Sequence, residues 1–127
     1  MMTYLLDTNV LVRFLVGDNK PQQEQAAKWF RQAEANDIEI VIDPAIIAET
    51  TFVLSSLYKF SRDRIADAME VLLSQRWLRV REREALLDLW PSYRAGFHFI
   101  DSYLIALSKP KGIAVLTFDK KLKTRAR

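Results

Sequence analysis

Four acidic residues occur where a strand is expected to end or where a helix is expected to be apolar. Asp7 follows the apolar stretch Tyr4-Leu5-Leu6. Asp119 comes shortly after a second apolar stretch, Ile113-Ala114-Val115-Leu116. Glu49 and Asp101 lie among apolar residues with helical spacing. Carboxylates are almost never buried without a partner or a metal ion, so four that converge would need cations. The pattern predicts a site for metal-dependent cleavage of phosphodiester bonds.

Taken singly, two of the four acids could serve a purely structural role. Helix capping accounts for Asp7 and Asp119, because aspartate is a favoured N-cap residue. Both also follow predicted parallel strands, whose carboxyl ends are where open α/β sheets bind ligands. Glu49 and Asp101 are harder to assign to such a role, since apolar residues lie one turn away on the faces that we expect to be buried, as Phe52 does for Glu49. The structural alternative for Asp101 is that an acid near a helix start gains from the helix dipole whatever its function.

The donor set narrows the choice of metal. The sequence has no cysteine and one histidine, His98, which excludes disulfides and zinc–thiolate sites. Carboxylate oxygens are hard ligands that suit Mg²⁺ or Mn²⁺ better than zinc or copper. Four acids could hold one ion tightly and a second loosely.

Length and composition indicate a single globular domain over residues 1–127. Half of the residues are hydrophobic and the net charge is +3, which agrees with a polyanionic partner such as nucleic acid. No apolar run reaches the ~20 residues of a membrane helix, and the start is too short for a signal peptide, so we expect a cytoplasmic protein. The end of the chain is basic and could simply be a solvated tail. Alternatively, it is an RNA-binding surface made of Lys120, Lys121, Lys123 and Arg125.

Helical and strand patterns alternate along the chain. Apolar stretches predict strands at 3–6, 38–42, 77–80 and 113–117. Helical spacing predicts helices at 9–15, 21–33, 44–58, 61–73, 82–90, 99–108 and 120–124, with Pro91 ending or kinking one and Pro110 and Gly112 stopping another. This alternation predicts an α/β domain with a mostly parallel sheet of four to five strands, covered by helices on both faces.

Four segments together resemble those of PIN-domain ribonucleases. They are Tyr4-Leu5-Leu6-Asp7-Thr8-Asn9-Val10-Leu11, Ile47-Ala48-Glu49 through Tyr58, Phe99-Ile100-Asp101-Ser102, and Leu116-Thr117-Phe118-Asp119-Lys120-Lys121-Leu122. Each motif is weak alone, but all four in this order are specific. The size and spacing are similar to the toxin half of VapBC toxin–antitoxin pairs over nearly the whole chain.

The resemblance implies a three-layer α/β/α sandwich and Mg²⁺- or Mn²⁺-dependent cleavage of RNA by a metal-activated water. It also implies a cognate antitoxin and a homodimer. Asp7, Glu49, Asp101 and Asp119 match the acidic quartet, with Asp7 and Asp101 as the most direct metal ligands, and Asn9 and Thr117 match supporting polar positions. His98 stands where many relatives carry an acid. We interpret it as structural or as an RNA contact rather than as a general base. The chain also stops soon after the fourth motif, so a final strand of many relatives is expected to be absent.

A separate hypothesis concerns the antitoxin. The first two predicted helices offer a groove in which Phe14, Trp29 and Phe30 would anchor an antitoxin segment, although core packing explains most of this apolar stripe. A basic side chain of that segment could enter the acidic pocket and compete with metal.

Two alternatives from other functional classes remain. A receiver-like phosphoacceptor domain is also parallel α/β with an acidic Mg²⁺ pocket, and Lys109-Pro110 matches its lysine-proline pair. However, the lysine here is predicted to end a helix rather than a strand. A non-catalytic binding domain, in which the acids are caps or ion-pair partners, is the second alternative.

Overall fold

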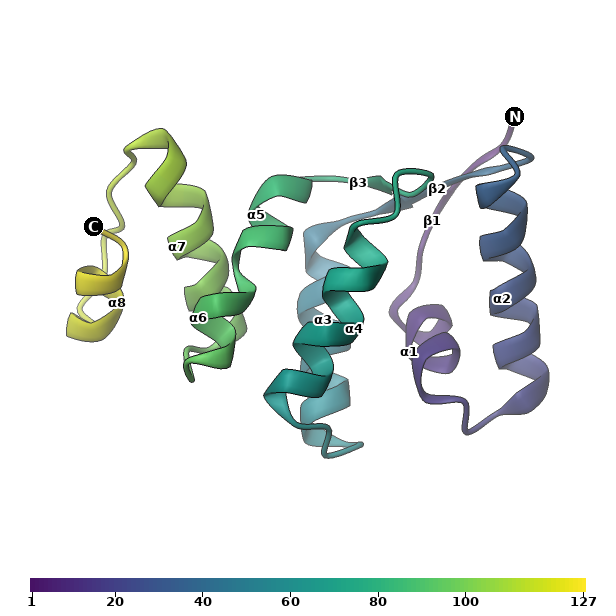
Figure 1. Ribbon diagram of the computed structural model, residues 1–127, viewed down its shortest axis with the longest axis horizontal. Helices are drawn as coiled ribbons and strands as arrows, with labels where there is room; N and C mark the ends of the chain where they lie inside the picture. Colours follow the sequence, from purple (N-terminus) through teal and green to yellow (C-terminus); the bar gives the residue numbers. More distant parts are fainter.

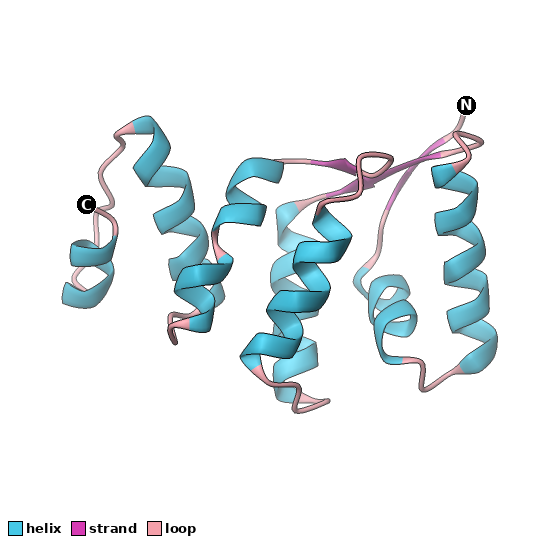
Figure 2. Ribbon diagram, viewed as in Figure 1, coloured by secondary structure: helices cyan, strands magenta, loops and turns pink.

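A short parallel sheet begins the fold. In the computed structural model, which describes residues 1–127, its strands are β1 (Thr3–Leu5), β2 (Glu39–Ile42) and β3 (Arg79–Val80). They are all parallel and lie in the order β1-β2-β3, with Tyr4 opposite Ile40 and Ile42 opposite Val80. Figure 2 shows the strands together along one side of a row of helices. The α/β class with a parallel sheet is confirmed, with three strands rather than four to five.

Eight helices connect and flank these strands (Figure 1). They are α1 (Thr8–Val16), α2 (Lys20–Glu34), α3 (Pro44–Ser56), α4 (Arg62–Leu73), α5 (Arg83–Asp88), α6 (Trp90–Arg94), α7 (Phe99–Lys111) and α8 (Lys120–Arg125). None of them is long and apolar enough to cross a membrane.

Local signals set most helix starts. The side chains of Asn19, Asp43, Ser61 and Asp119 each accept a hydrogen bond from a backbone N–H in the first turn of α2, α3, α4 and α8. Such caps satisfy N–H groups that have no partner within the helix.

The structure confirms a helix break beside Pro91 and a helix end at Gly112, whereas the predicted stop at Pro110 was wrong. Pro110 does not stop α7, which continues to Lys111 and ends at Gly112 in the left-handed conformation. A proline so near the end of a helix interrupts little of it. Pro91 lies in the first turn of α6, where its missing N–H costs nothing. The predicted helix 82–90 is therefore α5 followed by the start of α6.

One hydrophobic core runs through the molecule and joins 21 buried residues from Leu6 to Ala106. At one end, Trp90 is fully buried and makes edge-on contacts with Tyr93 and Phe99, at ring-centroid distances of 5.5 and 5.9 Å. At the other end, Phe30 packs edge-on against Phe14 at 4.6 Å.

The predicted strand 113–117 was wrong for this structure: the segment is a loop. Its first residue is held to α7, because the Ile113 N–H donates to the Ser108 carbonyl (3.0 Å). The Ser108 hydroxyl in turn donates to the Ala126 carbonyl at the end of α8 (3.4 Å). Leu122 of α8 is buried and α8 packs against α7. Figure 1 shows α7 and α8 at one end of the molecule and β1 with α2 at the other. The segment thus has no strand to pair with.

Candidate functional site

Asp7 follows β1 and occupies the N-cap position of α1. Its side chain nevertheless makes no capping hydrogen bond and takes part in no ion pair, and the residue is exposed. Capping, the simplest alternative to a functional role, therefore does not account for the carboxylate of Asp7. That carboxylate is free to bind a ligand.

Glu49 lies on α3, but not on the face that was predicted. The buried residues of this helix are Ile47, Thr50, Thr51 and Leu54, and Glu49 is exposed. The expectation that Glu49 belongs to the core-facing stripe was wrong, because α3 is apolar nearly all round and its spacing did not single out one face. No hydrogen bond or salt bridge involves the carboxylate of Glu49.

Asp101 is half-buried in the first turn of α7. His98, immediately before this helix, is its N-cap: Nδ1 accepts from the Ile100 N–H at 3.3 Å, and the His98 carbonyl accepts from the Ser102 hydroxyl at 2.9 Å. The structure thus gives the single histidine a structural role, one of the two that were expected, and contact with RNA stays a prediction. His98 fixes the turn that carries Asp101.

Asp119 caps α8, accepting from the Leu122 N–H at 3.0 Å. The Thr117 hydroxyl accepts from the Asp119 N–H at 3.0 Å, which fixes the backbone before the cap. Capping therefore accounts for part of the role of Asp119. The second carboxylate oxygen of this exposed residue has no hydrogen-bond partner in the protein.

The four acids do not meet in this structure. Asp7 begins α1 and Glu49 lies on α3, which packs against both α1 and α7, whereas Asp119 precedes α8 at the far end of the molecule. No three acidic or histidine side chains lie close enough together to hold a metal ion. The convergence expected from the sequence was wrong for this conformation, and the residues as placed here do not fit a bound metal.

Large exposed apolar side chains accompany every one of the four acids. Leu5 (72% exposed), Phe52 (64%) and Ile100 (45%) lie within three residues of Asp7, Glu49 and Asp101, respectively. Phe118, directly before Asp119, and Leu116 are fully exposed. Clusters of exposed apolar residues usually mark a surface that is covered in the working state. The acids therefore lie on surfaces that this conformation leaves uncovered.

Of the four residues of the predicted basic surface, three make no salt bridge and one contacts neighbouring helices. Lys120, Lys121 and Lys123 are exposed and form no salt bridge. Arg125 instead binds α8 to its neighbours: Nε lies 3.4 Å from the Ser92 hydroxyl, and the guanidinium lies over the ring of Phe97. The lysines are thus the better candidates for contact with a polyanion.

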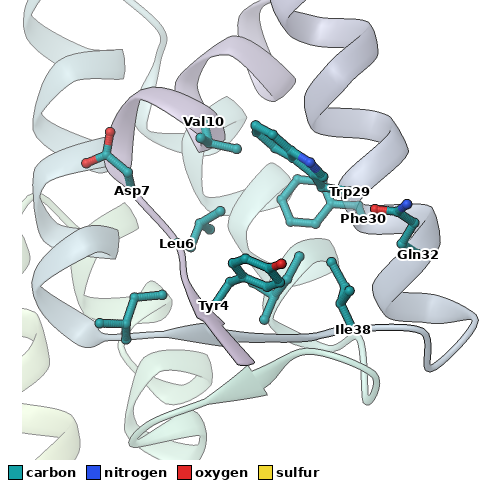
Figure 3. A pocket seen from close by; sticks show the side chains of 10 residues that line it. Tyr4, Leu6, Asp7, Val10, Trp29, Phe30, Gln32 and Ile38 are labelled. Carbon is teal, nitrogen blue, oxygen red and sulfur yellow. The ribbon is translucent and has the colours of Figure 1, made fainter. Parts of the chain in front are cut away.

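An apolar hollow of about 280 Å³ lies between β1 and α2. Figure 3 shows Trp29 and Phe30 on one side and Tyr4 and Leu6 on the other, with Asp7 at one end and its carboxylate directed away from the rings. Phe30 is only 4% exposed and belongs to the core, whereas Trp29 is 41% exposed. Phe14 does not line the hollow.

Asp43 is a further carboxylate at the same edge of the sheet. Asp43 directly follows β2, caps α3, and forms a salt bridge with Arg81 at 3.3 Å. Burial and the nearby carboxylates of Glu82 and Asp43 raise the pKa of Tyr103 on α7. Helix α7 thus faces the carboxyl ends of β2 and β3. Asp43 directly follows an apolar strand, as Asp7 does. This shared position is the sequence signal that could have predicted both carboxylates at the same edge of the sheet.

Comparisons with known proteins cover nearly the whole chain. A family model described as PIN domain matches residues 4–127. The chain is also similar to a protein named VapC ribonuclease from Aquifex aeolicus (strain VF5), with 26% identity over 122 residues, which is 94% of this chain and 89% of that relative. No solved structure matches the chain significantly.

Proposed function

Because the chain belongs to the PIN-domain family, we propose that it is an endoribonuclease that hydrolyses RNA phosphodiester bonds with Mg²⁺ or Mn²⁺. We further propose that it is the toxin of a VapBC-type toxin–antitoxin pair. The observation that carries the proposal is the similarity to a VapC ribonuclease over 94% of the chain, together with four acids in the order of the family motifs.

We assign the metal to Asp7, Glu49, Asp101 and Asp119, with Asp7 and Asp101 as the most direct ligands. Three observations support this. The carboxylates of Asp7 and Glu49 make no hydrogen bond within the protein, Asp101 stands at a helix start fixed by His98, and Thr117 fixes the backbone of Asp119. Asn9, exposed in the first turn of α1, remains a supporting residue in this proposal. The four must come together before they can hold an ion.

Substrate binding is assigned to the basic residues of α8. Lys120, Lys121 and Lys123 are exposed and unpaired directly after Asp119, and each phosphate they neutralise would release counterions. Arg125, which was expected to bind RNA as well, is more directly involved in holding α8 in place.

The antitoxin is assigned to the hollow between β1 and α2. Trp29 is the exposed aromatic residue there, while Phe30 supports it from the core, and Phe14 acts only through its contact with Phe30. Trp29→Ala is expected to weaken antitoxin binding without loss of folding, because half-exposed aromatic residues are typical anchors of interfaces. Normal binding by a folded Trp29→Ala protein would contradict this assignment.

A receiver-like function is not favoured. Lys109 and Pro110 lie inside α7, and the lysine does not follow a strand. The lysine-proline pair therefore resembles that of receiver domains in sequence but does not occupy the same position in the fold.

The test of the nuclease proposal compares Asp7→Ala and Asp101→Ala with wild type on total RNA, with and without Mg²⁺. Both variants and EDTA treatment are expected to abolish cleavage. Asp37→Ala is the matched control, because Asp37 is an exposed aspartate in the turn after α2, away from all four acids in sequence. Cleavage that persists in EDTA or in either site variant would refute the proposal and favour a non-catalytic binding domain.

A further inference from the structure

A hollow lined by arginine side chains lies at the amino edge of the sheet, opposite the edge where Asp7 and Asp43 lie. It has a volume of about 410 Å³ and lies between the amino ends of β2 and β3, the turn after α2 and the loop that joins α4 to β3. The charged side chains of this arginine hollow are those of Arg76, Arg79, Arg83 and Glu39.

Positive charge is not spread evenly over this chain. Residues 120–127 hold five of its 19 lysines and arginines and none of its 16 acids. Residues 1–119 therefore contain 14 basic and 16 acidic residues and are net negative. Within that part, the arginine hollow brings three positive charges together with one negative charge. It is thus a local positive site and not a sample of a generally basic surface.

The charges of the arginine hollow are only partly neutralised. Glu39 accepts from Arg79 at 3.2 Å, and the same carboxylate oxygen accepts from the Thr3 hydroxyl at 3.1 Å. The guanidinium of Arg83 contacts only carbonyl oxygens, and that of Arg76 is exposed and makes no hydrogen bond or salt bridge. Burial and the positive charge of Arg76 lower the pKa of Arg83, so the two guanidinium groups repel each other. An anion bound beside both would offset this repulsion.

The loop that carries Arg76, residues 74–78, is fixed to the rest of the molecule. The ring of Trp77 packs edge-on against Phe30, with ring centroids 6.1 Å apart. From the other side, Arg83 donates hydrogen bonds to three backbone carbonyls, those of Leu73, Gln75 and Leu78. The backbone position of Arg76 is therefore set before a ligand binds, which lowers the cost of ordering it.

We propose that the arginine hollow binds a phosphate group of the RNA backbone, away from the bond that is cleaved. Guanidinium groups bind phosphate through paired hydrogen bonds. Phosphate is favoured over a carboxylate, because its oxygens point in several directions and can accept from arginines on different elements of the hollow. Arg76 is the principal ligand, since it has no partner in the protein, and Arg79 adds its charge while it stays bound to Glu39.

The place of the hollow determines which part of the RNA it contacts. Asp7 follows the carboxyl end of β1, whereas the hollow lies at the amino ends of β2 and β3. A strand of four residues such as β2 spans about 13 Å, so only RNA that extends well beyond the cleaved bond can reach the hollow. Arg76 should therefore affect the KM for RNA and leave kcat unchanged. This inference rests on the proposed function, which supplies RNA as the polyanion.

The first experiment maps the contact without any cleavage. Wild-type protein in EDTA is treated with phenylglyoxal, which modifies accessible guanidinium groups, with and without poly(U) RNA, and the modified arginines are located by mass spectrometry. RNA is expected to protect Arg76. Arg64 is the control, because it is exposed in the first turn of α4, at the opposite end of that helix from Arg76, and does not line the hollow. Its reactivity should not change.

The second experiment removes the ligand. Arg76→Ala should weaken binding of poly(U) in EDTA by about tenfold, as expected for one charge-assisted hydrogen-bonded contact. It should also reduce the slope of log affinity against log salt by about 0.7. Arg76→Lys keeps the charge but loses the paired hydrogen bonds, so it should recover the slope and only part of the affinity. Arg64→Ala removes the same charge and should leave both quantities unchanged. Urea unfolding checks that all three variants are folded.

The outcomes separate the arginine hollow from the nuclease function. Protection of Arg76 by RNA in a protein that does not cleave RNA would support the hollow and refute the nuclease function. Cleavage by wild type, with Arg76 unprotected and binding by Arg76→Ala unchanged, would refute the hollow and leave the nuclease function standing.

Two further probes test the choice of ligand. Uridine monophosphate at the same phosphate concentration should protect Arg76 less than poly(U) does, and equal protection would overturn the assignment to an RNA strand. Polyglutamate should not protect Arg76. Protection by polyglutamate but not by RNA would assign the hollow to an acidic protein segment instead.

Discussion

Replacing Leu116 by serine separates the stability of one chain from the stability of its dimer. Leu116 is fully exposed within the chain, so Leu116→Ser should change the free energy of unfolding of the monomer by no more than about 0.5 kcal/mol. In a homodimer that covers this segment, the same side chain is buried twice. Burying one leucine contributes about 1.5–3 kcal/mol, so the dimer should lose roughly 3–6 kcal/mol, which corresponds to a roughly 10²- to 10⁴-fold larger Kd.

The measurement is sedimentation equilibrium over a dilution series, together with urea unfolding at a concentration where the protein is monomeric. Leu57→Ser is the matched control, since Leu57 is exposed but lies at the end of α3 and far from Leu116 in sequence. It should leave both Kd and unfolding unchanged. An unchanged Kd for Leu116→Ser would refute the burial of this residue in a dimer. A large loss of monomer stability would show instead that Leu116 is buried within its own chain.

Three further predictions concern separate parts of the molecule. Trp90→Ala should lower the free energy of unfolding by about 3–5 kcal/mol, measured in urea, because Trp90 is fully buried in the core. Replacing Lys120 and Lys121 by alanine should reduce by about two the number of counterions released on RNA binding, measured as the slope of log affinity against log salt. A hydrogen bond from Tyr58 lowers the pKa of Asp18 from 3.8. The stability it contributes should be present above pH 3.8 and be lost as the pH falls below it. The free energy of unfolding of Asp18→Asn, measured in urea across this pH range, should lack that acid-dependent loss. If Asp18→Asn and wild type showed the same pH dependence, the assignment to Asp18 would be wrong.

The sequence predicted best what short-range interactions decide. Helix starts at Asp43, Ser61 and Asp119 depend on a side chain and an N–H two or three residues away, and these predicted caps are confirmed. The cap at Asn19 was not predicted, because its segment was interpreted only as a break between helices. The order of strands and helices likewise followed from apolar spacing. The parallel class of the sheet followed from the long connections between the strands.

Long-range interactions decided what the sequence did not predict. A strand exists only beside another strand, and residues 113–117 lack one in this conformation, although their composition suits a strand. The face of α3 was misassigned for a related reason. With Ile46, Ile47, Phe52 and Leu54 distributed around the helix, spacing alone did not reveal which side meets the core.

These two errors both concern apolar side chains beside one of the acids. Glu49 was placed with Phe52 on a buried face, and Asp119 was placed after a buried strand; in the structure Phe52, Leu116 and Phe118 are all exposed. Sequence composition records that a side chain is apolar, but its burial depends on contacts between segments that lie far apart in the chain. The predicted environments of Glu49 and Asp119 therefore failed where such contacts, and not local spacing, decide what is buried.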